Sequence, residues 1–130
     1  AMASRRKQVQ RIFPLTTPED YASWVDKSDE VLVVCDFHKD WCGPCAVMDP
    51  TYDRVFMDYE EADQRVKFFS VSEDILTEEQ KAALPLPEDC KPLWVFFKHK
   101  VIIGKVVGAN APEVESILAD NIFPVPSEDQ

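Results

Sequence analysis

Two cysteines three positions apart, Cys42 and Cys45, directly follow an apolar, β-branched run from Val31 to Phe37. Such a run is typical of a buried strand, so the pair is predicted at the junction between this strand and a helix from about Gly43 to Glu61. In the first turn of a helix, unpaired backbone N–H groups and the helix dipole favour a thiolate at Cys42. Cys45, one turn further on, can then attack a mixed disulfide formed by Cys42.

Two cysteines at this spacing can also serve other purposes, and the residues alone leave these alternatives open. The pair could be half of a zinc site, but a second ligand pair is not evident, because Cys35, Cys90, His38 and His99 are all isolated in the sequence. It could be an inert structural disulfide, although a bridge that closes so few residues constrains the unfolded chain very little. The spacing therefore favours a reversible, redox-active dithiol over either alternative.

The length and net charge of the chain limit its domain organisation and the partners and compartments that fit it. A chain of 130 residues is predicted to form one domain, with a flexible basic segment at 1–8, a folded part at 9–122 and an acidic tail at 123–130. The net charge of −10 disfavours nucleic acid and anionic membranes as partners. With one close cysteine pair among four cysteines and no long apolar run, a reducing, cytoplasmic compartment fits better than secretion.

Strand-like and helix-like segments alternate along the chain. Thr17, Thr77 and Asn110 have the residue pattern of helix N-caps, and Pro50 should kink the helix that follows the dithiol. The pattern predicts an α/β fold in which helices flank both faces of a central mixed sheet. The expected strands are 9–13, 31–37, 66–71, 93–97 and 101–107, the last two forming an antiparallel hairpin, and the expected helices are 17–27, 43–61, 77–84 and 110–121.

The motif Trp41–Cys45 is accompanied by Asp36 on the preceding strand, Pro50 after the second cysteine, Pro92 before an apolar strand, and Gly108 before the last helix. With these residues the chain resembles the thioredoxin family. The spacing of these residues is similar to the family pattern over most of the chain. The resemblance implies the thioredoxin fold.

It also implies a role for each matching residue. Cys42 would be the attacking thiolate, Cys45 the resolving cysteine, and Asp36 a buried acid that takes a proton from Cys45. The chain would need no cofactor beyond a redox-active Cys42–Cys45 disulfide. Its partners would be proteins that bear disulfides and a thioredoxin reductase.

The resemblance further implies a substrate-binding face beside the dithiol. A cis bond before Pro92 would present backbone with which a substrate peptide could pair as an added strand. Cys90, two residues earlier, is expected to be exposed and is a candidate regulatory thiol that could join two chains. The candidate substrate-binding residues are Trp41, Gly43, Pro44, Lys91, Pro92 and Gly108.

Two functions follow from the resemblance. The first is reduction of protein disulfides. The second is a redox-sensing, thioredoxin-like subunit of a larger assembly, because the chain is similar in size and motif to the small thioredoxin-related light chains of flagellar outer-arm dynein. The second function implies a dynein heavy chain as partner and the axoneme as location. Lys91 and the long acidic segment from Glu73 to Cys90, which depart from the family pattern, put the substrate in doubt more than the chemistry.

Overall fold

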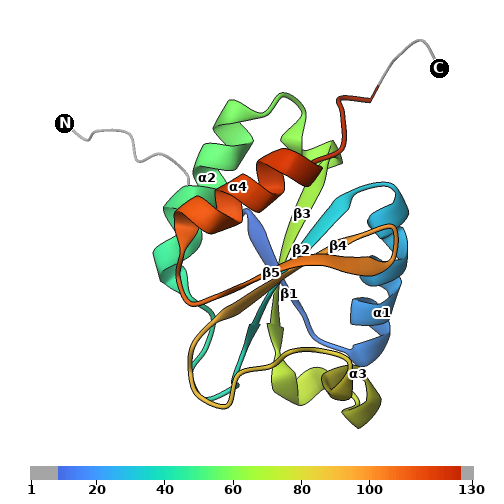
Figure 1. Cartoon of the computed structure of the whole chain (residues 1–130), viewed down its shortest axis with the longest axis vertical. Coiled ribbons are helices and arrows are strands. Elements are labelled where there is room, and N and C mark those ends of the chain that lie inside the picture. The colour runs from blue at the N-terminus through green and yellow to red at the C-terminus, as the bar shows by residue number, and fades with distance from the viewer. Residues whose placement is uncertain (1–8, 127–130) are drawn as a thin grey trace.

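The computed structural model describes residues 9–126 (Figure 1). The order of the strands and α-helices is the predicted one, and the predicted flexible segment 1–8 lies outside the described residues. The strands are β1 (Ile12–Leu15), β2 (Leu32–His38), β3 (Val66–Ser72), β4 (Leu93–Lys98) and β5 (Val101–Val107). The α-helices are α1 (Pro18–Asp26), α2 (Asp49–Asp58), α3 (Glu78–Ala82) and α4 (Ala111–Asn121).

The strands form one mixed sheet in the order β1-β3-β2-β4-β5. Strand β3 runs parallel to both β1 and β2, whereas β4 is antiparallel to β2 and to β5. The predicted antiparallel hairpin of β4 and β5 is therefore confirmed. Because β2 lies in the middle of the sheet, all its residues from Leu32 to Phe37 are buried.

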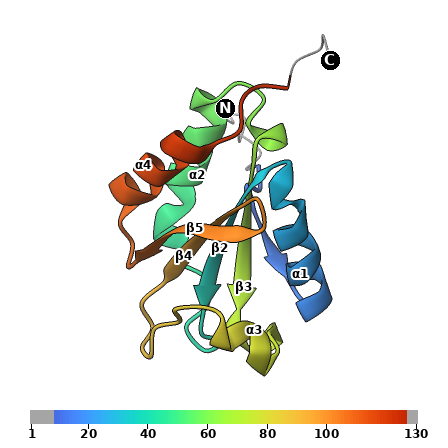
Figure 2. The same cartoon turned by 45° about the vertical axis from the view of Figure 1, so that its right-hand side comes forward.

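Helices cover both faces of this sheet, as the sequence predicts (Figures 1 and 2). Successive residues of a strand point to opposite faces, so β2 contributes to two cores. Cys35 and Phe37 pack on the side of Tyr21 in α1. Leu32 and Val34 belong to the core on the side of α2 and α4.

Three predicted N-caps are confirmed, but the helix after the dithiol differs from its prediction. The side chains of Thr17, Thr77 and Asn110 each accept a backbone hydrogen bond at the start of a helix. Helix α2 begins only at Asp49, so Pro50 lies in its first turn and introduces no kink. Proline is favoured there because its missing N–H is not needed and its φ is already helical.

The hairpin turn is tied to α1 by a buried serine. Ser28, fully buried after α1, donates from its hydroxyl to the carbonyl of Val25 at 2.6 Å and accepts from the N–H of Lys100 at 2.7 Å. His99 and Lys100 both have positive φ, which the tight turn requires. Phe123, the first residue of the predicted acidic tail, contacts His99 edge-to-face, so packing continues one residue beyond the predicted domain boundary.

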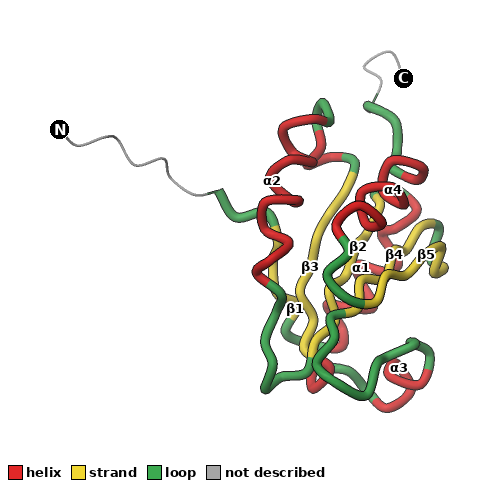
Figure 3. Tube along the Cα trace, turned by 60° about the vertical axis from the view of Figure 1, so that its left-hand side comes forward, coloured by secondary structure: helices red, strands yellow, loops and turns green. Residues whose placement is uncertain are grey.

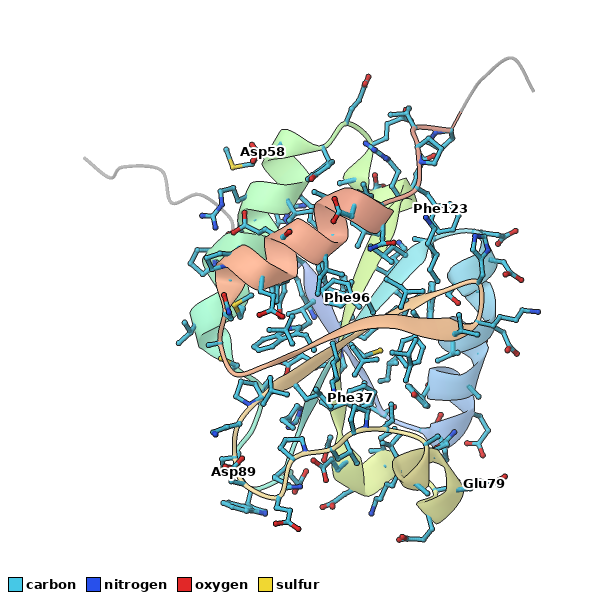
Figure 4. All side chains as sticks on the ribbon, in the orientation of Figure 1. Phe37, Asp58, Glu79, Asp89, Phe96 and Phe123 are labelled. Carbon is cyan, nitrogen blue, oxygen red and sulfur yellow. A yellow bond between two sulfur atoms is a disulfide. The ribbon has the colours of Figure 1, made fainter. Side chains whose placement is uncertain are left out.

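The loops that matter for function gather at one end of the sheet. The segment between β2 and α2 lies at the same end as α3 and the loop that leads from α3 to β4 (Figure 3). Asp89 marks this second loop, which we call the 83–92 loop (Figure 4). Sequence-distant cysteines are thereby brought to one edge of the molecule.

Substitution of the buried Ser28 by alanine should lower the free energy of unfolding by about 1–3 kcal/mol, because the part-buried N–H of Lys100 would lose its acceptor. Chemical denaturation at neutral pH measures this change. Ser23→Ala, at an exposed position of α1, is the matched control and should shift stability by less than about 0.5 kcal/mol. Equal stabilities of the two variants would contradict the role assigned to Ser28.

Candidate active site

The site is built on Asp36, which lies near the end of the central strand β2. Asp36 is only 1% exposed, and its neighbours across the sheet are Ser70 in β3 and Trp94 in β4. The prediction that this acid is buried is therefore confirmed. Its side chain points to the same face of the sheet as Leu32 and Val34, and the layer formed by the dithiol segment, α2 and α4 shields that face from solvent.

The carboxylate of Asp36 contacts the dithiol segment directly. Its Oδ2 accepts a hydrogen bond from the backbone N–H of Cys45 at 3.3 Å. Its Oδ1 is buried and has no hydrogen-bond partner among the described residues. Burial raises the pKa of Asp36 to about 7, with a smaller increase from the negative charge of Asp49, while the N–H of Cys45 opposes both. The group can therefore hold or release a proton near neutral pH.

A buried aromatic pair lies beneath this carboxyl group. Trp94 donates from Nε1 to the hydroxyl of Tyr52 at 2.7 Å, and both side chains are almost completely buried. Burial and the negative charge of Asp36 raise the pKa of Tyr52, so its hydroxyl stays protonated. No sequence motif predicts this pair, because the sequence around Tyr52 indicates only an apolar position of a helix.

The dithiol segment is not helical, contrary to the prediction. Gly43 has φ +71°, Cys45 is extended with φ −87° and ψ 103°, and α2 starts only at Asp49. Proline disfavours a helical conformation of the residue before it, which explains why Gly43 leaves the helical region ahead of Pro44. Cys42 thus lies outside the first turn of α2, and the predicted activation of its thiolate by the helix dipole has no basis in this geometry.

The observed pairing of the cysteines also differs from the prediction. Cys42 forms a disulfide with Cys90 of the 83–92 loop, whereas Cys45 carries a free thiol. The expected Cys42–Cys45 disulfide is therefore not the one in this structure. The reason is tertiary: the extended backbone at Cys45 and the folded 83–92 loop place Cys90, 48 residues away in sequence, with its Cα 6.0 Å from that of Cys42. This separation lies within the usual range of about 4.4–6.8 Å.

The remaining cysteine is sequestered. Cys35 is fully buried in the core on the α1 side. Burial raises the pKa of the Cys35 thiol, with a smaller increase from the charge of Asp36. A protonated, inaccessible thiol is unreactive.

The candidate substrate-binding residues before Cys45 lie at the surface. Trp41 is 77% exposed, so it is not part of the core, and Pro44 is also exposed. Beside the free thiol, Pro44 and Cys45 line a hollow of about 350 Å³ together with Pro14 of β1 and Asp49. Cys45 therefore has an opening to solvent that does not pass through Cys42.

The other candidates meet at the start of β4. The carbonyl of Pro92 accepts from the N–H of Gly108 at 2.8 Å, and Lys91 is exposed next to them. Gly108 has φ +90°, a conformation that favours glycine. No cis peptide bond occurs in residues 9–126, so the cis bond implied before Pro92 is absent and the ordinary trans form is present.

The structure also reveals an ion pair that sequence reasoning missed. The ammonium of Lys39 lies 2.9 Å from both carboxylate oxygens of Glu73 and donates to the carbonyl of Pro87 at 2.7 Å. Both charged side chains are mostly shielded from solvent. This contact, which we call the Lys39 clamp, connects the end of β2 to the 83–92 loop. Only the tertiary contact identifies it, since an isolated lysine after a strand carries no signal.

Among the described residues, no group of three or more His, Cys, Asp or Glu side chains is arranged to hold a metal ion. Within the same part of the chain, each helix is too short or too polar to cross a bilayer.

The sheet order, the flanking helices and an acid beneath a Cys-x-x-Cys segment define a thioredoxin-fold protein. A family model described as Thioredoxin matches residues 13–120, so the chain belongs to the thioredoxin family. Over 123 residues the chain is 33% identical to thioredoxin H9 of Arabidopsis thaliana, which covers 89% of this chain and 79% of that protein.

A second kind of relative is a motor subunit. The chain is 28% identical over 109 residues to the dynein 14 kDa light chain of the flagellar outer arm of Chlamydomonas reinhardtii, with 82% of this chain and 80% of that protein covered. Both parts of the resemblance drawn from the sequence are therefore found among known proteins.

Solved structures agree with the fold. Thioredoxin from Schistosoma mansoni matches with a TM-score of 0.64 and 27% identity, covering 85% of this chain and 94% of that one. The thioredoxin NaTrxh of Nicotiana alata matches with a TM-score of 0.69, covering 92% of this chain and 100% of that one. At 22% identity, the second match supports the fold alone.

The raised pKa of Asp36 predicts a pH-dependent stability. Unfolding returns the carboxyl group to its ordinary value of 3.8, so between pH 4 and 7 the unfolded chain releases this proton before the folded chain does. The contribution of Asp36 to stability must therefore decrease as pH rises through that window. Asp36→Asn should remove the dependence and be more stable than the parent at pH 8, by about 4 kcal/mol.

Urea denaturation of both proteins from pH 4 to 8, with all disulfides intact, measures the effect. Asp49→Asn is the matched control, because it removes a nearby but exposed carboxylate. In the control, the free energy of unfolding should still decrease with rising pH almost as steeply as in the parent. Identical pH profiles for the parent and Asp36→Asn would contradict the assignment.

Proposed function

We propose that this protein is a thiol–disulfide oxidoreductase that reduces protein disulfides through Cys42 and Cys45. The observation that carries the proposal is the buried carboxyl group of Asp36, whose Oδ2 accepts from the backbone of Cys45 and whose pKa is raised to about 7. A buried acid without a salt bridge is costly in folding and is typical of a site that moves protons. Membership of the thioredoxin family supports the same general activity.

The proposed reaction uses the dithiol form of the protein. The thiolate of Cys42 attacks one sulfur of a substrate disulfide, which forms a mixed disulfide and releases the first substrate thiolate. Cys45 then attacks the sulfur of Cys42 while Asp36 accepts the proton of the Cys45 thiol. The substrate leaves fully reduced, and two electrons have passed from the protein to the substrate. A reductase of the thioredoxin reductase class would restore the dithiol.

Substrates would dock on the exposed residues around Cys42. Trp41 offers an exposed apolar surface next to Cys42, and Lys91 and Pro92 directly follow Cys90, which is bonded to Cys42. Gly108 donates to the carbonyl of Pro92, which keeps the start of β4 in place. A protein substrate with an extended, accessible disulfide fits such an open surface better than a small molecule does.

The proposal predicts turbidity in an insulin-reduction assay driven by dithiothreitol. Cys42→Ser should abolish the catalysed rate, because it removes the nucleophile. Asp36→Asn should slow the reaction at pH 7 by at least about tenfold, since the proton of Cys45 loses its acceptor. Cys35→Ala, a substitution of the buried cysteine outside the site, is the control and should keep near-parental activity. Full activity in Cys42→Ser would overturn the proposal.

A second function is favoured by the similarity to the flagellar light chain. We propose that the chain can also serve as a redox-sensing subunit of a flagellar outer dynein arm, bound to a dynein heavy chain in the axoneme. The coverage of both chains by this match supports a subunit of similar size and architecture. Docking and disulfide exchange do not exclude each other, because exchange uses only one end of the sheet.

Sedimentation of an axonemal high-salt extract tests the docking proposal. A tagged chain should co-sediment with the dynein heavy chain rather than remain at the top of the gradient as a free 14.9 kDa protein. Cys42→Ser should co-sediment as well, which would separate docking from chemistry. Exclusive recovery of the parent chain in the free fraction would exclude the subunit function.

A further inference from the structure

The active-site nucleophile is bonded to a third cysteine. Cys42 is half-buried and Cys90 is exposed, and their disulfide leaves Cys45 as a free thiol beside Asp36. The two sulfurs come from segments 48 residues apart. The site therefore contains two thiols that can each bond to Cys42, one from the same turn and one from the 83–92 loop.

Specific contacts hold the 83–92 loop against the dithiol segment. The Lys39 clamp begins three residues before Cys42 and reaches the carbonyl of Pro87, which is three residues before Cys90. Both ends of the clamp are thus equally close in sequence to the two bonded cysteines. Glu73 takes both of its hydrogen bonds from the same ammonium, which fixes the lysine in place.

The loop is also held beyond Cys90, where the carbonyl of Pro92 accepts from the N–H of Gly108 at 2.8 Å. Within the loop, the N–H of Lys91 donates to Oδ1 of Asp89 at 3.0 Å, so this bond spans Cys90 itself. Because Cys90 lies between Pro92 and the Lys39 clamp, contacts other than the disulfide also hold it near Cys42. Such pre-positioning raises the effective concentration of one thiol at another.

We propose that Cys90 is a second resolving cysteine of this site, an inference that rests on the proposed disulfide-reducing function. In the mixed disulfide, the thiolate of Cys90 attacks the sulfur of Cys42, after its proton has passed to solvent. The bond between Cys42 and the substrate sulfur breaks, and the substrate thiolate takes up a proton from water. The products are reduced substrate and the Cys42–Cys90 disulfide that the structure contains.

A second exchange connects the two protein disulfides. Cys45 attacks the sulfur of Cys42 and passes its proton to Asp36, the Cys42–Cys90 bond breaks, and the thiolate of Cys90 takes a proton from solvent. This step consumes no electrons, because one disulfide replaces another. The oxidised protein thus exchanges between an inner Cys42–Cys45 disulfide and an outer Cys42–Cys90 disulfide that a reductant can reach on the exposed loop.

The reagent 5,5′-dithiobis(2-nitrobenzoate) tests the proposal, because each attack on it releases one coloured thiolate. One equivalent is added to the fully reduced parent, Cys45→Ser, Cys90→Ser and the double variant Cys45→Ser/Cys90→Ser. Attack releases the first thiolate in every case, and resolution releases the second. We expect two thiolates per chain from each single variant and only one from the double variant.

Peptide mapping identifies the bond that forms. Resolved Cys45→Ser should contain the Cys42–Cys90 disulfide in most of its chains. If Cys45→Ser instead releases one thiolate and keeps the adduct, as the double variant does, Cys90 is not a resolving cysteine. A parent that forms Cys42–Cys90 with the reagent but never reduces insulin would overturn the proposed function, and it would do so without contradicting the attack of Cys90 on the sulfur of Cys42.

Variants of the Lys39 clamp distinguish a resolving role of Cys90 from a merely structural disulfide. In the Cys45→Ser background, Lys39→Met should slow release of the second thiolate by about tenfold or more, while the first release is unchanged. Lys81→Met, which removes a solvent-exposed ion pair with Glu78 on α3, is the matched control and should leave both rates unchanged. If Lys39→Met does not fold, Glu73→Gln should give a smaller slowing of the same step. Equal second rates in the clamp variant and the control would contradict the positioning role of Lys39.

Discussion

The placement of strand β2 at the centre of the sheet is the constraint on which the rest of the site depends. The strand pairs with β3 on one side and β4 on the other, and the helices on both faces bury it together with the carboxyl group of Asp36. Buried charge is unfavourable, so the site is stabilised in its protonated form near neutral pH. The chain leaves the sheet at the end of β2, and Lys39 and the dithiol segment follow directly.

The two possible partners of Cys42 differ in what they do to the chain. A Cys42–Cys45 bond would close a very short loop and would constrain the unfolded state little. The Cys42–Cys90 bond spans 48 residues, and a loop of that length corresponds to about 4 kcal/mol in the chain-entropy description of disulfides. The outer disulfide therefore supports the fold and covers the nucleophile at once, whereas the inner one would serve exchange alone.

Local signals predicted the architecture well. The alternation of apolar strands with capped helices gave the order of all the elements, and the N-caps at Thr17, Thr77 and Asn110 were correct because capping depends on a few neighbouring residues. The burial of Asp36 was predictable for a similar reason, since it follows an apolar run of strand type. The start of α2 was missed, because Pro44 and Pro50 each permit a helix boundary and sequence alone does not choose between them.

By itself, then, the sequence determined the fold class, the buried acid and the presence of a Cys-x-x-Cys pair after the central strand, all of which follow from local patterns along the chain. The tertiary structure alone decided which sulfur bonds to Cys42, how Lys39 reaches Pro87, and that Trp94 and Tyr52 form a pair beneath Asp36. Each of these contacts joins residues more than 40 positions apart. Such contacts depend on how the strands and loops pack against one another in the folded chain. A pattern within a short segment carries no information about that packing.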